Sequence, residues 1–204
     1  ELLSTAEGEQ LLTGHRREIT ALFADLRGFT AFAEQAEPEE VLGVLREYHR
    51  AVGEIAVANG ATVEHFAGDG LMVFFNDPQP VADHQLAAVR SACQMRDRFG
   101  VLSTAWRKRG YDLGLGIGIA AGFATLGRIG FEGRYDYGAV GNAVILASRL
   151  SDAAAAGQIL ISQRVMAAIE EHADADPATT LELKGFSHPI AAFAVTALRD
   201  VTSG

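Results

Sequence analysis

The apolar residues of this chain follow two spacings, one typical of buried strands and the other of amphipathic helices. The run Ile19–Ala24 is apolar at nearly every position, as in a strand in the middle of a sheet that is covered on both faces. Between residues 31 and 58, apolar residues recur at near-helical spacing, with Pro38 at the predicted start of the main helix and Asn59-Gly60 at its end. The chain therefore opens with a predicted strand followed by a helix.

A predicted hairpin comes next. Two short β-rich stretches, Thr62–Phe66 and Leu71–Phe75, flank the sequence AGDG, which is typical of a β-hairpin turn. Strands that alternate with helices, together with hairpins, predict an α/β (α+β) fold with a mixed sheet flanked by helices. The remaining predicted elements are a helix over 83–99 that continues toward residue 109, a strand over 111–121, an extended arm and return strand over 122–141, a helix over 142–150, a strand over 158–162, a helix over 163–172 and two strands within 180–198.

Length and composition narrow the class of protein. A chain of 204 residues predicts one domain, placed at residues 18–198, with an entry helix or linker from an upstream domain before it (1–17) and a short tail after it (199–204). The net charge of −9, without a basic stripe, argues against nucleic-acid binding. No apolar run reaches the roughly 18 residues of a membrane span. The single cysteine, Cys93, suits a reducing compartment, so we expect a cytoplasmic location.

Two acidic residues stand where the chain turns. Asp25 ends the first predicted strand and precedes a glycine-containing turn into a helix, and Asp69 lies at the tip of the predicted hairpin. Each has a structural alternative, Asp25 as a helix cap and Asp69 as part of an ordinary Asp-Gly turn. If the hairpin pairs beside the first strand, the two carboxylates meet and repel each other unless a cation joins them. The N–H groups at the start of the helix would suit phosphate oxygens.

Five motifs occur in a consistent order, and together they resemble the catalytic domain of class III adenylyl/guanylyl cyclases over residues 17–195. The motifs are FADLRGFT (23–30), FAGDGLM (66–72), GIAAG (118–122), DYGAVGNAVILASR (136–149) and Lys184-Gly185. The resemblance implies a ferredoxin-like core and a head-to-tail homodimer whose active sites are built from both chains. It also implies that a nucleoside triphosphate is cyclised to a 3′,5′-cyclic monophosphate with release of pyrophosphate.

The resemblance assigns the metal and phosphate sites residue by residue. It implies that two divalent cations, Mg²⁺ or Mn²⁺, are held by the carboxylates of Asp25 and Asp69 and by the Leu26 carbonyl. The backbone N–H groups of Gly28, Phe29 and Thr30 would bind the β- and γ-phosphates, and a side chain at Gly28 would obstruct the close approach of this turn.

Two basic residues complete the implied phosphate chemistry. Arg149 matches the arginine that stabilises the transferring phosphate, with a surface arginine near a helix C-terminus as its structural alternative. Lys184 would neutralise triphosphate charge, although lysine is also common in turns.

Two positions that read the base in the family are altered here. The lysine of adenylyl cyclases is replaced by His65, whose neutral imidazole donates at one nitrogen and accepts at the other, so it does not dictate adenine. A strand histidine at a dimer surface is the alternative. The second position, Asp or Thr in adenylyl cyclases, is Gly138, which offers no side-chain hydrogen bond, and Asp136 matches a non-reading position. Glu64 lies one residue before the position where guanylyl cyclases have Glu. On a regular strand that step points Glu64 to the opposite face, so we do not expect it to substitute.

The position of the transition-state asparagine is also altered. It lies four residues before Arg149, on the same helix face, and here it is Ile145. Isoleucine cannot hydrogen-bond the reacting groups and its bulk crowds a site that needs polar lining. Losing one positioned hydrogen bond of this kind costs about 2.7–4 kcal/mol of transition-state stabilisation. Asn142, one turn earlier, is the nearby amide that would partly substitute.

Three hypotheses follow from these residues. The first is a divergent cyclase of low activity that acts on a purine nucleoside triphosphate, ATP in preference, under the control of an upstream sensor or regulatory domain. The second is a catalytically silent cyclase-fold module for dimerisation or nucleotide binding. The third is a guanylyl cyclase. Asp25, Asp69 and Arg149 favour the first hypothesis, whereas His65, Gly138 and Ile145 favour the second.

Overall fold

The structure is a computed structural model that describes residues 14–131 and 134–199, and its centre is one long strand. This strand, β1 (His15–Arg27), pairs antiparallel with β3 (Gly70–Phe75) on one side and with β4 (Gly114–Phe131) on the other. The order across the sheet is β2-β3-β1-β4-β6-β9-β7, with β5 paired to β4 and β8 to β9. The further strands are β2 (Thr62–Ala67), β5 (Arg134–Val140), β6 (Ile159–Ser162), β7 (Ala173–Ala175), β8 (Thr179–Leu181) and β9 (Ile190–Leu198).

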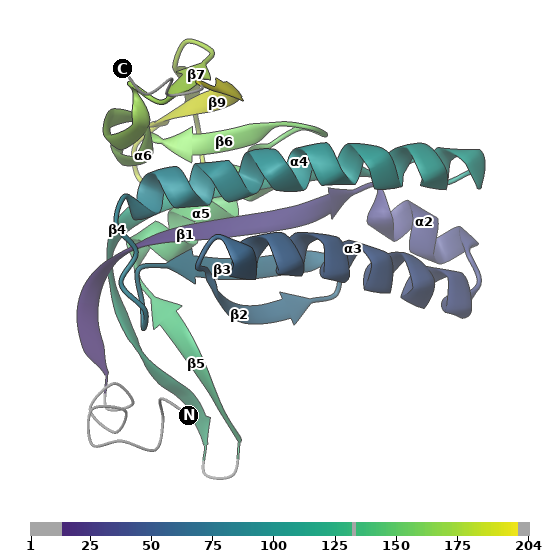
Figure 1. Cartoon of the computed structure of the whole chain (residues 1–204), viewed down its shortest axis with the longest axis horizontal. Coiled ribbons are helices and arrows are strands. Elements are labelled where there is room, and N and C mark those ends of the chain that lie inside the picture. Colours follow the sequence, from purple (N-terminus) through teal and green to yellow (C-terminus); the bar gives the residue numbers. More distant parts are fainter. Residues whose placement is uncertain (1–13, 132–133, 200–204) are drawn as a thin grey trace.

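Helices cover both faces of this sheet (Figure 1). Because β4 pairs parallel with β6 and antiparallel with its other neighbours, the sheet is mixed, as the sequence predicted. The helices are α2 (Phe29–Gln35), α3 (Pro38–Ala58), α4 (His84–Lys108), α5 (Asn142–Ala153) and α6 (Gln163–Ile169). The fold is the ferredoxin-like core expected of class III cyclases.

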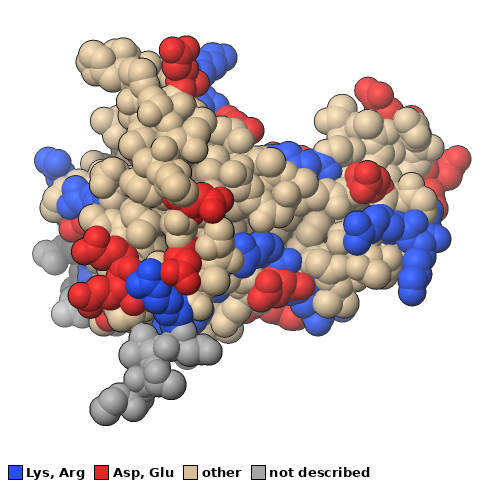
Figure 2. All heavy atoms as spheres, turned by 90° about the horizontal axis from the view of Figure 1, so that it is seen from above, with Lys and Arg blue, Asp and Glu red and all other residues tan. Residues whose placement is uncertain are grey.

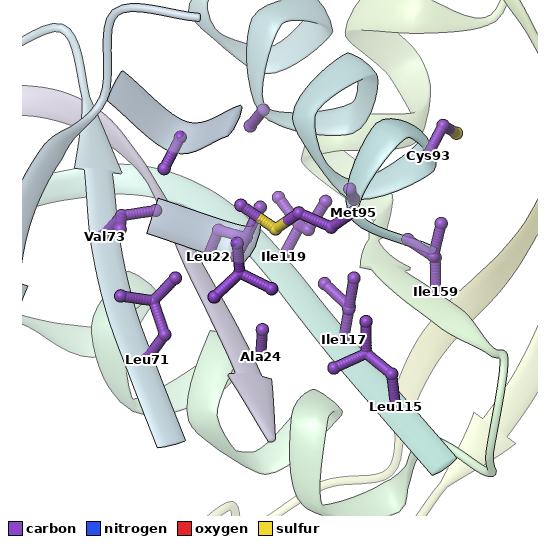
Figure 3. Close-up of a cluster of buried hydrophobic side chains, with 14 of the residues drawn as sticks. Leu22, Ala24, Leu71, Val73, Cys93, Met95, Leu115, Ile117, Ile119 and Ile159 are labelled. Atoms are coloured by element: carbon purple, nitrogen blue, oxygen red, sulfur yellow. The ribbon is translucent and has the colours of Figure 1, made fainter. Parts of the chain in front are cut away.

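The apolar pattern of β1 explains its central position. Leu22 and Ala24 point into the cluster under α3 and α4, where they lie with Met95 of α4 and with side chains of β3, β4 and β6 (Figure 3). Ala21 points to the opposite face and packs with Ala147 and Leu150 of α5. A strand that is apolar on both faces therefore has a hydrophobic layer on each side, which is what the run Ile19–Ala24 predicted.

Glycines on β4 bring α5 close to the sheet. A Cβ at Gly118 would overlap the backbone of Ala147 and Ser151, and a Cβ at Gly116 would overlap the Arg27 guanidinium. The alternating glycines at 114, 116 and 118 were predicted to lie on a strand rather than in a dinucleotide-binding loop. In the structure they leave space beside β4 for α5 and for the Arg27 side chain. The sequence showed the strand but not the reason for its glycines.

Several predicted boundaries need correction. Strand β1 begins at His15, so the predicted limit of the entry segment at residue 17 falls inside a strand, and residues 1–13 lie outside the described residues. Strand β4 begins at Gly114 rather than at 111, α6 ends at Ile169 rather than at 172, and the short strand β7 was not predicted. The tail at 200–204 also lies outside the described part.

The structure also places the charged side chains, the helices and the single cysteine. Lys and Arg side chains are interspersed with Asp and Glu on the face seen in Figure 2, rather than gathered in one basic stripe. In the part of the chain that the structure describes, no helix is long and apolar enough to cross a membrane. Cys93 is buried in α4 as a free thiol.

Candidate active site

The sheet brings Asp25 and Asp69 together. Asp25 is the residue of β1 that pairs with Gly70, the residue after Asp69, and an ideal Cβ on Gly70 would lie 3.4 Å from its Oδ1. Burial raises the pKa of Asp25, the Asp69 carboxylate raises it further, and Arg27 opposes the shift. The Asp69 carboxylate therefore lies near enough to Asp25 to disfavour its ionised form.

The chemistry of these donors fits a hard divalent cation. Carboxylate oxygens supplemented by a backbone carbonyl are the ligands that Mg²⁺ prefers, with water or substrate phosphates completing its coordination. Within 14–131 and 134–199, no group of three or more His, Cys, Asp or Glu side chains has metal-binding geometry. The carboxylate pair as a metal site stays a prediction, as does the Leu26 carbonyl as a further ligand.

Arg27 joins the Asp25 carboxylate to the end of α5. Its Nη1 lies 3.1 Å from Asp25 Oδ2, its Nε donates to the Ala154 carbonyl at 2.8 Å and its Nη2 donates to the Ser151 carbonyl. Since the guanidinium is held by two backbone carbonyls, it restricts the Asp25 side chain and partly neutralises the acidic pair. Nothing in the sequence indicated this role of Arg27, because the two carbonyls that it binds are remote along the chain.

Two consecutive residues of α3 hold the backbone at both aspartates. The Tyr48 hydroxyl, fully buried, donates to the Ala24 carbonyl at 3.0 Å, immediately before Asp25. The His49 Nε2 lies 2.8 Å from the Gly68 carbonyl, immediately before Asp69, and its ring packs on Phe66 with centroids 4.4 Å apart. One rigid helix therefore sets the spacing of the two acids. Sequence reasoning treated Tyr48 only as an apolar helix position and missed His49.

The turn at Gly28 begins α2. Gly28 has φ of +81°, and a Cβ there would lie 3.0 Å from the Asp112 carbonyl, so glycine is required by its left-handed backbone as well as by close approach. The first helical hydrogen bond runs from the Phe32 N–H to the Gly28 carbonyl. The N–H groups of Phe29 and Thr30 precede it and have no partner within the helix.

The exposed face of α5 carries the predicted transition-state residues. Asn142, Ile145 and Arg149 are spaced three and four residues apart, so they lie along one side of the helix. Ile145 is 47% exposed, so its side chain is accessible on this face of α5. The Arg149 Nη1 lies 2.8 Å from Asp152 Oδ2, and its Nε is buried without a hydrogen-bond partner among the residues that the structure describes. Asp152 also raises the pKa of Asp25, so this end of α5 belongs electrostatically to the acidic pair.

The base-reading positions lie on β2 and β5. His65 is exposed on β2 and pairs with Met72, and Gly138 lies in the middle of β5, paired with Gly127. The prediction that Glu64 points away from this region is wrong. The register of β2 shifts between Val63 and His65, and the Glu64 carboxyl lies against Gly138. A bulge breaks the two-residue alternation on which that prediction depended.

Lys184 lies in the loop between β8 and β9, exposed, with Gly185 at φ of +91° beside it. No hydrogen bond or ion pair of Lys184 is found within the described chain, and its role toward phosphate stays a prediction.

Comparisons with known proteins agree on the family, but the similar proteins include both adenylyl and guanylyl cyclases. Residues 13–197 match the family model "Adenylate and Guanylate cyclase catalytic domain". Adenylate cyclase 1 of Rhizobium meliloti is 32% identical over 175 residues, which cover 84% of this chain and 26% of that protein. The chain thus spans about a quarter of the length of this relative.

Solved structures give the same result. The adenylyl cyclase CyaB from P. aeruginosa superposes with a TM-score of 0.88 and 36% identity, covering 92% of this chain and 97% of that one. The guanylyl cyclase Cya2 superposes equally well, with a TM-score of 0.88 and 34% identity, covering 93% and 96%. One of these equally similar structures is named an adenylyl cyclase and the other a guanylyl cyclase. Overall similarity therefore does not show which nucleotide this chain uses. The chain belongs to the family of class III adenylyl/guanylyl cyclase catalytic domains.

Proposed function

We propose that this domain converts ATP to 3′,5′-cyclic AMP and pyrophosphate, at a low rate, at the interface of a head-to-tail homodimer. The observation that supports this most strongly is the meeting of Asp25 and Asp69 beside the Gly28 turn. In the parent chain, we propose, an upstream sensor or regulatory domain controls the activity, since the relatives are several times longer than this chain.

The proposed reaction assigns a separate role to each group. The ribose 3′-oxygen attacks the α-phosphorus in line, the new 3′-O–P bond forms, and the bond to the β-phosphate breaks as pyrophosphate leaves. Divalent cations, when bound, lower the pKa of the 3′-hydroxyl and neutralise phosphate charge. Asp25, Asp69 and the Leu26 carbonyl hold them, and the N–H groups of Gly28, Phe29 and Thr30 orient the β- and γ-phosphates.

Arg149 supplies charge to the transferring phosphate in this proposal, and Lys184 supplies charge to the triphosphate. Both donate through positive nitrogens that can face an oxyanion. Arg149 would exchange its present partner, Asp152, for a phosphate oxygen. Asn142 has its amide on the same face of α5, and Ile145 between these two residues contributes no hydrogen bond.

A dimer is supported by the exposed apolar surface. Phe123 is 51% exposed on β4, Val140 is 64% exposed on β5 and Ile145 is exposed on α5. Large apolar side chains that lie exposed on neighbouring elements mark contact surfaces. A second copy of the chain is the partner that the family's architecture implies.

The second candidate is a cyclase-fold module that dimerises and binds nucleotide without turnover. It is favoured by the exposed Ile145 at the position where the reaction needs a polar group. A third, guanylyl cyclase activity, is supported by the similarity to Cya2. These candidates predict different products from the same assay.

The test is direct. Purified domain is incubated with ATP or GTP and with Mn²⁺ or Mg²⁺, at a concentration where the dimer is present, and the cyclic product is measured. We expect cyclic AMP, with a decrease of at least about a thousandfold in the Asp25→Ala variant, because loss of a metal ligand removes several kcal/mol of charge stabilisation. Absence of product with both nucleotides would contradict the catalytic proposal, and exclusive formation of cyclic GMP would contradict the choice of ATP.

A further inference from the structure

Glu64 is the extra residue at an irregularity of β2. Val63 pairs with Val73 and His65 pairs with Met72, so two steps along β2 correspond to one step along β3. Bulges of this kind commonly redirect a side chain near a functional site. Here the redirected side chain is a carboxylate on the strand that carries the exposed His65.

The Glu64 carboxyl occupies the space of a side chain at position 138. An ideal Cβ on Gly138 would overlap Glu64 Oε1 and would lie 3.2 Å from its Cδ. The same Cβ would lie 2.7 Å from Ile129 Cδ1, so a residue larger than glycine at 138 would displace the Glu64 carboxyl and the Ile129 side chain. Gly138 and Glu64 are complementary, since Gly138 leaves the space and Glu64 places a hydrogen-bonding group in it.

Little within the described chain satisfies this carboxyl. Its Oε2 is buried without a hydrogen-bond partner, and no Lys or Arg of the described residues forms an ion pair with it. Burial raises the pKa of Glu64, while the neighbouring His65 and the Ala139 N–H oppose the shift. An acceptor that is buried without a partner is costly, so it indicates a donor that the isolated chain does not supply.

We propose that Glu64 is the residue that selects adenine, by accepting a hydrogen bond from the 6-amino group of the base in place of the side chain missing at Gly138. This inference rests on the proposed function, because it assumes that a nucleotide base lies beside β2 and β5. An ionised carboxylate only accepts hydrogen bonds. The 6-amino group of adenine donates, whereas the 6-oxygen of guanine accepts and would face the carboxylate with like polarity.

A binding experiment with three nucleotides tests this without depending on turnover. Wild-type domain is titrated, in the presence of Mn²⁺, with ATP, GTP and purine riboside triphosphate, which lacks the 6-amino group. We expect ATP to bind about tenfold or more tightly than either of the others, the range of a hydrogen bond to a charged group. The Glu64→Gln variant has the same size but can also donate to a 6-oxygen, so the ratio of ATP to GTP affinity should fall about tenfold.

Two further variants separate base reading from a structural role. Gly138→Ala leaves Glu64 in the sequence but displaces its carboxyl, so it should reduce the ATP preference as Glu64→Gln does. Glu54→Gln, an exposed residue of α3, is the matched control and should keep the wild-type ratio.

The outcomes are distinguishable. If folded Glu64→Gln binds nucleotide with an unchanged ratio of ATP to GTP affinity, the carboxyl serves only to connect β2 to the Ala139 N–H. That result would overturn this inference and leave the proposed function standing. Failure of the wild-type domain to bind any of the three nucleotides would overturn the proposed function on which the inference rests.

Discussion

The two ends of the candidate site differ in how closely they match the family. At the metal end, Asp25, Asp69 and the Gly28 turn match the family motif, and α3 and Arg27 hold them from behind. At the base end, His65 and Gly138 depart from it, and Glu64 lies where no motif would place it. Between the two ends, Ile145 on α5 also departs from the motif. In the proposed function, charge handling and base reading therefore fall to different groups of residues, and only the first group matches the family motif.

The largest expected effect is a gain of function at position 145, between the two ends. Replacing Ile145 by Asn restores a polar group on the face of α5 that carries Arg149, and we expect cyclic product to form about a hundred to a thousandfold faster. The measurement is the rate of product formation at saturating ATP. Ile145→Leu, which keeps the apolar character, is the control and should show no gain. If Asn gives no gain although sedimentation shows an intact dimer, Ile145 is not what limits the rate.

A smaller effect is expected behind the metal end. Tyr48→Phe removes the hydroxyl that holds the Ala24 carbonyl and leaves that buried acceptor without its partner. Since a hydrogen bond of this kind contributes about 1 kcal/mol, we expect Mn²⁺ affinity to fall about fivefold.

Spin resonance of free Mn²⁺ during titration measures this affinity. Tyr135→Phe, on the exposed part of β5, removes a comparable hydroxyl far from the aspartates and is the control. Equal Mn²⁺ affinity in wild type and Tyr48→Phe would show that α3 does not set the carboxylate spacing.

The smallest effect concerns stability without metal. Because the pKa of Asp25 is raised in the folded state, the folded protein holds this proton at a pH where the unfolded chain has lost it. Stability in chelator should therefore fall as the pH rises from the ordinary value of 3.8 through the raised folded value. Asp69→Asn removes one cause of the shift, so its decline should be shallower and its Tm at neutral pH about 1–3 °C higher. Identical Tm profiles from pH 4 to 8 would contradict this electrostatic coupling.

Local signals account for what the sequence predicted. The run Ile19–Ala24 has the apolar pattern of a strand covered on both sides, and the AGDG turn has hairpin chemistry. Pro38 begins α3 within a capping box formed by Glu37 and Glu40, so the limits of this helix were also predicted. The approach of Asp25 to Asp69 follows from placing the hairpin beside β1.

The features that were missed depend on distant partners. No residue type near Glu64 marks a bulge in the sequence, and only the pairing of β2 with β3 shows it. The sequence places Tyr48 and His49 on a helix but does not predict their hydrogen bonds. Their partners, the carbonyls of Ala24 and Gly68, are remote in sequence. In the sequence Arg27 is only one residue of a motif. Its guanidinium lies against Gly116 of β4, and this contact is visible only in the structure.

The central claim is that the carboxylates of Asp25 and Asp69 share a divalent cation. The most direct test is the affinity for Mn²⁺ with ATP present. Spin resonance measures it in wild type, Asp25→Asn and Asp69→Asn. We predict saturable binding in wild type and a loss of at least about tenfold in affinity in each variant, since each amide removes a charged ligand. Equal Mn²⁺ affinity in all three proteins would contradict the account.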